Sequence, residues 1–99
     1  MTRTLEKVMT FKLVGISHQQ GAREMLSRMI DGVSVTLVRE PHNRYDRRAI
    51  AVQYQGQKLG FIKADENALI SRWLDDNHHR EYPAKFVNAG EKITVELPL

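Results

Sequence analysis

Apolar and polar residues alternate along six stretches of the chain, and this alternation is typical of β-strands with one buried face. The predicted strands are 9–17, 33–38, 49–54, 58–63, 82–88 and 92–97. In the last stretch, Ile93, Val95 and Leu97 alternate with polar residues. Around Val14 and Ile16 both faces of the first strand are apolar, so we expect that strand to be central in a sheet or part of a closed barrel.

Two further stretches have the spacing of amphipathic helices. Their apolar stripes comprise Ala22, Met25, Leu26, Met29 and Ile30 in the first, and Leu69, Ile70, Trp73 and Leu74 in the second. We expect the first helix to stop at Asp31-Gly32, where glycine can form a left-handed cap. The second should run from Glu66 to about Asp76, with Asp65 as its N-cap. The methionines and the tryptophan are interpreted as core residues.

The pattern predicts strands and helices in the order β-α-β-β-β-α-β-β. Short strands, tight hairpins and only two short helices favour a mainly β fold of α+β type, a small antiparallel β-barrel with its helices plugging or flanking it. We expect a single domain over residues 1–99, in which residues 1–8 form a loose lead-in.

The composition is that of a soluble globular chain, with 99 residues of which 41% are hydrophobic. The chain has no cysteine, which excludes disulfides and thiolate metal sites and suits a reducing compartment. No apolar run is long enough to span a membrane, and residues 1–7 lack the apolar core of a signal peptide. We therefore expect a cytoplasmic (intracellular) protein.

The charges are distributed unevenly about a net charge of +3. Residues 1–63 hold 11 Lys and Arg against 5 Asp and Glu, a balance of +6, whereas residues 64–99 hold 4 against 7, a balance of −3. This asymmetry points to an anionic partner on the N-terminal two-thirds of the chain, or else to a dipolar surface without a partner.

One polar segment, residues 39–48, separates two of the predicted strands. Pro41 lacks a backbone donor, and the side chains of Asn43 and Asp46 can close turns on the nearby backbone. Tyr45 is the one aromatic residue among these polar and charged neighbours. A loop of this kind carries either a structural turn or a binding site.

A combination of short motifs in the chain resembles the HIRAN domain, a module of SWI2/SNF2-type DNA helicases that also occurs alone. The motifs are Val14-Gly15-Ile16, Arg39-Glu40-Pro41, Asn43-x-Tyr45-Asp46, Ala49-Ile50-x-Val52 and Leu59-Gly60-Phe61-Ile62, and the resemblance covers roughly residues 10 to 90. It implies an OB-like β-barrel that binds single-stranded DNA and captures its 3′ end.

The resemblance also implies roles for individual residues. In the best understood members, the tyrosine of the turn stacks on the terminal base, and the following aspartate accepts a hydrogen bond from the 3′-hydroxyl. These roles fall to Tyr45 and Asp46, with Asn43 as a supporting polar contact. The implied setting is DNA repair or replication-fork processing, with a helicase or nuclease on another chain as partner.

The chemistry of the segment agrees with such a role. A carboxylate repels phosphate, so Asp46 among Arg44, Arg47 and Arg48 is better suited to accept a hydrogen bond from a sugar hydroxyl, with the arginines holding the adjacent phosphates. The alternative is that Asp46 pairs with Arg39, Arg47 or Arg48 and merely fixes the turn.

Three further residues each have two interpretations. Phe61 matches a position where the family places an aromatic residue or histidine near the nucleotide, but its place on the strand also suits the core. Lys63 can contact a phosphate or simply end a solvated strand. Arg39 matches a residue that is usual in the family, or it forms a structural salt bridge with Glu40 or Asp46.

Two departures from the family pattern concern the specificity for a 3′ end. The family often places an aromatic residue just after the first strand to close a sandwich around the base, whereas this chain has Ser17-His18-Gln19, so that His18 would stack more weakly. Arg44 replaces the proline of the turn, which adds charge but loosens the loop.

Enzymatic interpretations have little support. The histidines at 18, 42, 78 and 79 lack a metal-binding spacing and no nucleophile or nucleotide-binding motif occurs, so we expect no catalytic residue, metal or cofactor. A nuclease using Asp46 and Glu40 with a metal would usually gather more carboxylates. The main alternative is a protein–protein interaction module, in which the barrel edge or the methionine-bearing helix binds a partner. The sequence leaves the oligomeric state open.

Overall fold

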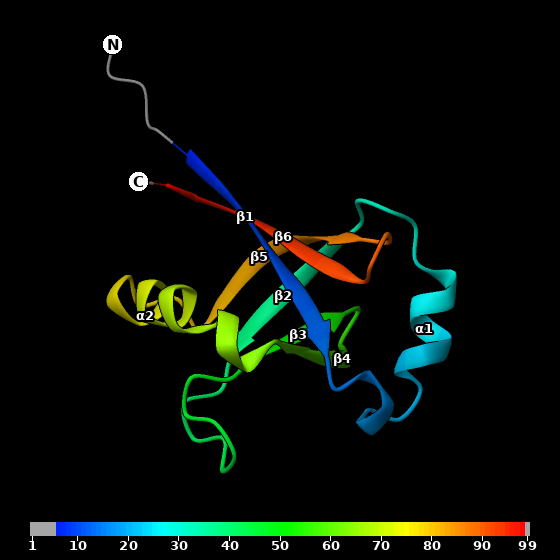
Figure 1. Cartoon of the computed structure of the whole chain (residues 1–99), viewed down its shortest axis with the longest axis horizontal. Coiled ribbons are helices and arrows are strands. Elements are labelled where there is room, and N and C mark those ends of the chain that lie inside the picture. Colours follow the sequence, from blue (N-terminus) through cyan, green and yellow to red (C-terminus); the bar gives the residue numbers. More distant parts are fainter. Residues whose placement is uncertain (1–5, 99) are drawn as a thin grey trace.

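The computed structural model describes residues 6–98, which form a closed barrel of six strands (Figure 1). Neighbouring strands follow the order β1-β4-β3-β2-β5-β6, and every pair is antiparallel. The strands are β1 Glu6–Val14, β2 Ser34–Arg39, β3 Ile50–Tyr54, β4 Gln57–Ile62, β5 Glu81–Val87 and β6 Lys92–Pro98. The helices are α1 Ala22–Arg28 and α2 Ala68–Asp76, with short 3-10 turns η1 Ile16–His18 and η2 Ala64–Glu66. The predicted mainly β barrel with two short α-helices is therefore confirmed.

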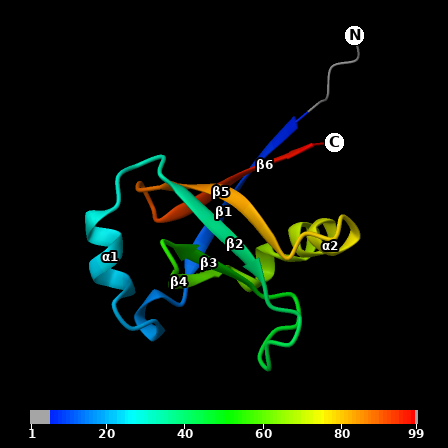
Figure 2. The ribbon, with the colours of Figure 1, turned by 180° about the vertical axis from the view of Figure 1, so that it is seen from behind.

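The core forms because each strand turns its apolar alternate positions into the barrel. On β6 the side chains of Ile93, Val95 and Leu97 are buried. α2 adds Ile70 and Leu74, which are fully buried, and the two helices lie on opposite sides of the barrel in both views (Figures 1 and 2). Removing such side chains from water stabilises the fold by about 25 cal/mol per Å² of apolar surface. Neither helix of residues 6–98 is long and apolar enough to cross a membrane.

β1 differs from the predicted first strand at both ends. It begins at Glu6, so residues 6–8 belong to a strand and not to a loose lead-in, while residues 1–5 lie outside the described part. The physical reason is the long antiparallel pairing of β1 with β6, which covers the whole of β6. The strand ends at Val14 because Gly15 adopts φ +75° and turns the chain into η1.

α1 is shorter than predicted. It ends at Arg28, and Ile30 is 73% exposed instead of forming part of the buried stripe. Met29 is buried and Met25 is partly buried against the core. Both methionines therefore pack against the core of the protein. Gly32 has the positive φ expected of a left-handed cap, +86°, but it lies in the loop beyond the helix end.

α2 begins at Ala68 instead of Glu66, and Asp65 is not its N-cap. Asp65 lies in η2, where its carboxylate is 3.0 Å from Nζ of Lys63. The spacing of residues alone does not show whether Asp65 caps the helix or pairs with Lys63.

The predicted apolar stripe of α2 is buried only in part. Leu69 is 58% exposed, whereas Trp73 is partly buried and packs against the core. The Trp73 ring lies 5.5 Å from the ring of His79 and 5.2 Å from that of Tyr82, centroid to centroid. These three rings seal α2 against the start of β5, so the tryptophan is a packing residue as predicted.

The loop between β2 and β3, residues 40–49, is called the hook below. In Figures 1 and 2 it projects from the same side of the barrel as η1. The two are brought together by the seam of β1 and β4, which pair only at Leu13↔Ile62 and Val14↔Phe61. A turn after β1 and a loop after β2 therefore meet at one end of the barrel.

Candidate nucleic-acid interface

A groove of about 630 Å³ lies between the hook and η1. Its lining comes from the end of β1 with η1, from the hook, from β4 and from η2. The residues are Val14, Gly15, His18, Gln19, Glu40, Asn43, Tyr45, Asp46, Ala49, Lys58, Phe61, Ile62 and Ala64. The groove thus brings together five of the predicted site residues, namely His18, Asn43, Tyr45, Asp46 and Phe61, while Arg44, Arg47 and Lys63 lie outside its lining.

Asn43 determines the shape of the hook. Its side-chain oxygen accepts hydrogen bonds from the backbone N–H groups of Tyr45, at 2.9 Å, and Asp46, at 3.0 Å. Its Nδ2 donates to Oε1 of Glu40 at 3.0 Å. An asparagine that holds its own downstream backbone in this way is an Asx turn. Asn43 therefore uses its polar groups within the hook, and its contribution to the groove is to aim the two residues that follow.

The carboxylate of Asp46 is fixed at both oxygens. Oδ1 accepts the backbone N–H of Arg48 at 2.9 Å, and Oδ2 accepts Nδ2 of Asn67 at 2.8 Å. Asn67 is fully buried at the start of α2, so the hook is tied to the body of the protein through this contact. Among residues 6–98 no arginine side chain pairs with Asp46. Each carboxylate oxygen can accept a second hydrogen bond, so Asp46 retains acceptor capacity toward the groove.

Three aromatic side chains from separate elements border the groove. Tyr45 at the tip of the hook is 90% exposed, and His18 at the end of η1 is also exposed. Phe61 on β4 is half-buried, so its ring belongs to the lining and not to the interior of the barrel. Nζ of Lys58 lies 5.0 Å from the centre of the Phe61 ring, within the range of a cation–π contact.

Glu40 and Lys58 form an ion pair at the edge of the groove that sequence reasoning did not identify. Nζ of Lys58 lies 2.7 Å from Oε2 of Glu40. Burial raises the pKa of the Glu40 carboxyl, but hydrogen bonds from Lys58 and Asn43, together with the charge of Lys58, outweigh it and leave that pKa below its ordinary value. The available signal was Lys58 itself, a cation three residues before Phe61 on the same strand, but the contact of β4 with the hook is not visible in the sequence.

The arginines of the hook keep their charges free. Arg44, Arg47 and Arg48 are exposed, and in the part of the chain that is described no ion pair or hydrogen bond engages their guanidinium groups. Lys63, by contrast, is held by Asp65, whose hydrogen bond and charge raise the pKa of the lysine. Arg44 and Arg47 therefore offer unneutralised positive charge next to the groove.

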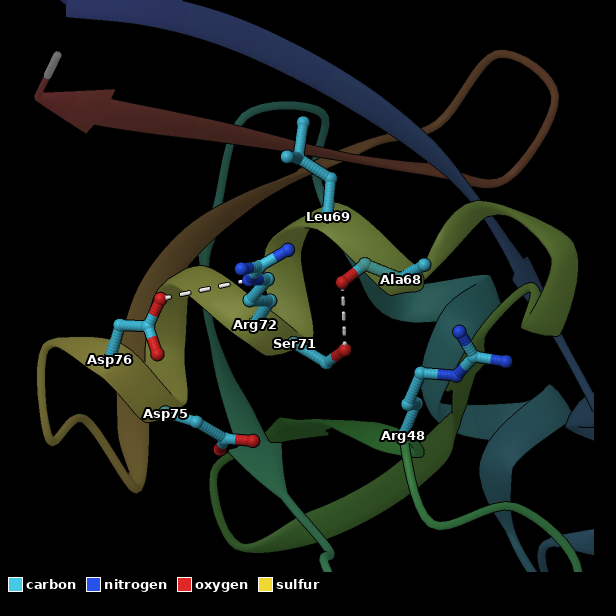
Figure 3. Close-up of a pocket in the computed structure, with 7 residues that line it drawn as sticks. All are labelled: Arg48, Ala68, Leu69, Ser71, Arg72, Asp75 and Asp76. Atoms are coloured by element: carbon cyan, nitrogen blue, oxygen red, sulfur yellow. Dashed lines mark hydrogen bonds and ion pairs between the residues drawn. The ribbon is translucent and has the colours of Figure 1, made fainter.

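Arg48 faces a different depression, of about 500 Å³, which runs along α2 (Figure 3). In this view Arg48 lies beside the helix and Leu69 projects from the helix in a direction away from Arg48. The side chain of Arg72 is joined to that of Asp76. This depression shares no lining residue with the groove. The side chain of Arg48 thus lies at this depression and not at the groove.

The structure gives Arg39 a structural salt bridge, but not with the predicted partners Glu40 or Asp46. Its Nε and Nη2 donate to the two carboxylate oxygens of Asp75 on α2 at 3.0 and 3.1 Å, and its Nη1 donates to the carbonyl of Ala49 at 3.1 Å. Arg39 is only 7% exposed. It joins β2, the end of the hook and α2, and no sequence signal connected it with a helix 36 residues away.

The two acidic residues considered for a nuclease, Glu40 and Asp46, are held by Lys58 and by Asn67 with the backbone of Arg48. Within residues 6–98 no group of three or more His, Cys, Asp or Glu side chains is arranged to hold a metal ion.

Comparison with known proteins identifies relatives of this fold. A family model described as HIRAN domain matches residues 7–98. A crystal structure of a protein from Lactobacillus plantarum is similar with a TM-score of 0.74 and 21% identity, over 95% of this chain and 94% of that one. The crystal structure of the HIRAN domain of human HLTF is similar with a TM-score of 0.65 and 20% identity, over 92% of this chain and 73% of that one. No curated protein sequence is similar enough to count as a match.

Proposed function

The chain belongs to the HIRAN domain family, a family of DNA-binding modules, and from that premise we propose that it binds single-stranded DNA at a 3′-hydroxyl end. The observation that carries the proposal is the groove, because aromatic rings, the carboxylate of Asp46 and the ion pair of Glu40 and Lys58 surround one opening at the end of the barrel. A terminal nucleotide presents the matching groups, which are a flat base, a free hydroxyl and a phosphate. The module binds without catalysis of its own.

Tyr45 supplies the stacking surface for the terminal base. Its ring is 90% exposed on a loop whose conformation is fixed by Asn43, so it is presented to a ligand and is not needed for packing. Stacking on an aromatic side chain contributes about 1–3 kcal/mol per base and tolerates any base. His18, from η1, provides a second and smaller ring on the same groove.

Asp46 accepts the hydrogen bond of the 3′-hydroxyl. Its oxygens already hold Asn67 and the backbone of Arg48, which fixes the direction of the remaining lone pairs. A phosphate at the 3′ position would bring negative charge against the same carboxylate. The arrangement therefore favours a hydroxyl end over a phosphorylated one.

The cations around the groove hold the phosphates of the same strand. Arg44 and Arg47 have no acidic partner within the described residues, whereas Lys58, which borders the groove beside Phe61, already pairs with Glu40 and adds less free charge. Lys63, the residue after β4, contributes a phosphate contact when its ammonium group exchanges Asp65 for the phosphate. We assign the activity to DNA repair or replication-fork processing in the cytoplasm, where free 3′ ends arise, with a helicase or nuclease on another chain as partner.

The proposal is tested by mapping the binding surface with backbone amide chemical shifts. A short thymidine strand with a 3′-hydroxyl is titrated into the labelled protein. We expect shifts concentrated in residues 15–19, 43–49 and 57–64, and little change at residues 78–82. Shifts confined to α1 or to the outer face of α2, or no shifts at all, would contradict the proposal and favour a protein-interaction module.

A further inference from the structure

Three lysines cluster on the outer face of the sheet formed by β1, β6 and β5. Lys12 and Lys92 are directly opposite each other in the β1–β6 register. Lys85 pairs with Thr94 in the β5–β6 register, so it lies diagonally across from Lys92. All three lysines are exposed, and within residues 6–98 no carboxylate pairs with their ammonium groups.

This placement is unfavourable for the protein alone, because like charges directly opposite each other destabilise an antiparallel pair. Two nearby acids have hydrogen-bond or ion-pair partners of their own, and a third, Glu96, lies on the same face beside Lys85 and away from Lys12 and Lys92. Oε1 of Glu66 accepts the backbone N–H of Lys12 at 2.9 Å, and Oε2 of Glu91 pairs with Arg23 at 2.7 Å. The positive charge of Lys12 and Lys92 thus remains available to an external anion.

The lysines lie in continuation of the groove. Val14, which lines the groove, and Lys12 share one face of β1 because they are two residues apart, a separation of about 7 Å. The carbonyl of Lys12 accepts the backbone N–H of Lys63 at 3.0 Å, which links this position to the end of β4. A strand that leaves the groove along β1 would therefore pass over Lys12 and then Lys92.

We propose that Lys12 and Lys92 bind the phosphodiester backbone of the DNA strand a few nucleotides away from the captured 3′ end, with Lys85 at the far side of the cluster. This inference rests on the proposed function and assigns the direction in which the strand leaves the groove. A polyanion fits the site because its successive phosphates can neutralise both lysines at once. Binding there reads charge and not sequence.

The test compares a thymidine trinucleotide with a strand of about ten thymidines, a length within the range covered by one OB-type barrel. Binding is measured by fluorescence anisotropy for the wild type and for the double variant Lys12→Gln/Lys92→Gln. The matched control is Lys7→Gln/Arg80→Gln, which removes two charges from the opposite face of β1 and from the loop before β5. Thermal unfolding of all three proteins verifies that they are folded.

We expect the longer strand to bind the wild type more tightly than the trinucleotide, and the double variant to lose about fivefold in affinity for the longer strand only. The slope of log affinity against log salt should fall by about 1.4, since about 0.7 is lost for each single-strand phosphate contact. The control should behave as the wild type.

Other results distinguish this inference from the proposed function. Tight trinucleotide binding with an unchanged length dependence in the double variant would overturn the lysine site and leave end capture intact. Lysine-dependent binding of the longer strand without any trinucleotide binding would support the lysine site and overturn end capture. Binding of neither strand would overturn both.

Discussion

At the scale of single residues, the hook is organised by short polar contacts that leave one large ring unused. The side chains of Asn43 and Asp46 form hydrogen bonds with the backbone of the hook and with Asn67. Tyr45, which lies between them in the sequence, is 90% exposed. The roles of Tyr45 and Asp46 were predicted from the resemblance to a family. The partners that position them, Asn67 and the pair of Glu40 and Lys58, could not be predicted because they come from distant parts of the chain.

Replacing Tyr45 by alanine should weaken binding of single-stranded DNA without affecting the fold. The loss of one stacking contact predicts a decrease of about 1–3 kcal/mol in binding free energy, measured by fluorescence anisotropy. Because the ring is exposed, the free energy of unfolding should change by less than about 0.5 kcal/mol. Tyr45→Phe retains the ring and should bind nearly as the wild type. Equal weakening by both substitutions would contradict a stacking role.

Glu40 predicts a defined pH dependence of stability. Its pKa in the folded protein lies below the ordinary value of 4.5, so the unfolded chain binds its proton more readily. The pair with Lys58 is therefore fully stabilising above about pH 5 and is lost as the pH falls through the lower pKa of the folded state. Urea unfolding between about pH 7 and pH 3 should show that Glu40→Gln is less stable than the wild type at neutral pH. The two proteins should converge in acid, and a difference that is constant with pH would contradict this assignment.

At the scale of elements, the alternation of apolar residues was sufficient to predict all six strands, and the helical spacing of apolar residues was sufficient to predict both α-helices. These patterns did not predict the end residues of the elements, because single contacts determine where a strand or helix begins and ends. β1 extends to Glu6 because the whole length of β6 pairs with it. α2 begins at Ala68 instead of Glu66, and Asp65 forms an ion pair with Lys63 instead of capping the helix. The buried Arg39 is a similar case, since its partner Asp75 belongs to a helix that the sequence does not associate with β2.

The attachment of α2 to the barrel depends on the pair of Arg39 and Asp75. Asp75→Ala leaves a buried guanidinium without its carboxylate and should lower the free energy of unfolding by about 1–3 kcal/mol. The neighbouring substitution Asp76→Ala is the control. Asp76 is 69% exposed and lies 3.9 Å from Arg72, so its loss should cost less than about 0.5 kcal/mol. Similar values for the two variants in denaturant unfolding would argue against this role of Arg39.

The seam between β1 and β4 depends on Gly60. A Cβ atom at this position would lie 2.4 Å from the carbonyl oxygen of Val14, a backbone atom that cannot move aside cheaply. Gly60→Ala should therefore destabilise the barrel by about 2–4 kcal/mol, measured by thermal or urea unfolding. Gly56→Ala meets no atom within 4 Å and has only the strain of its φ of +80°, about 1–2 kcal/mol. A smaller effect at Gly60 than at Gly56 would contradict the close approach.

At the scale of the whole molecule, closing the barrel is what creates the groove. The hook follows β2 and η1 follows β1, and these segments become neighbours only because β4 joins β1 and β3 in the closed sheet. The sequence alone predicted a barrel and located the aromatic and acidic residues. The expectation that His18, Tyr45 and Phe61 share one nucleotide site came from the resemblance to a family, because the residue pattern alone does not give the order of strands around the barrel.

The most direct measurement of the central claim is fluorescence anisotropy with two short 5′-labelled single strands that differ only in a 3′-hydroxyl or a 3′-phosphate. The wild type should prefer the hydroxyl end by about ten- to a hundredfold, the range of a hydrogen bond to a charged group. Asp46→Asn should lose this preference, whereas Asp76→Asn, which removes a carboxylate far from the groove, should keep it. Equal binding of both ends by the wild type would contradict capture of the 3′ end and leave a barrel that binds single strands through charge and stacking alone.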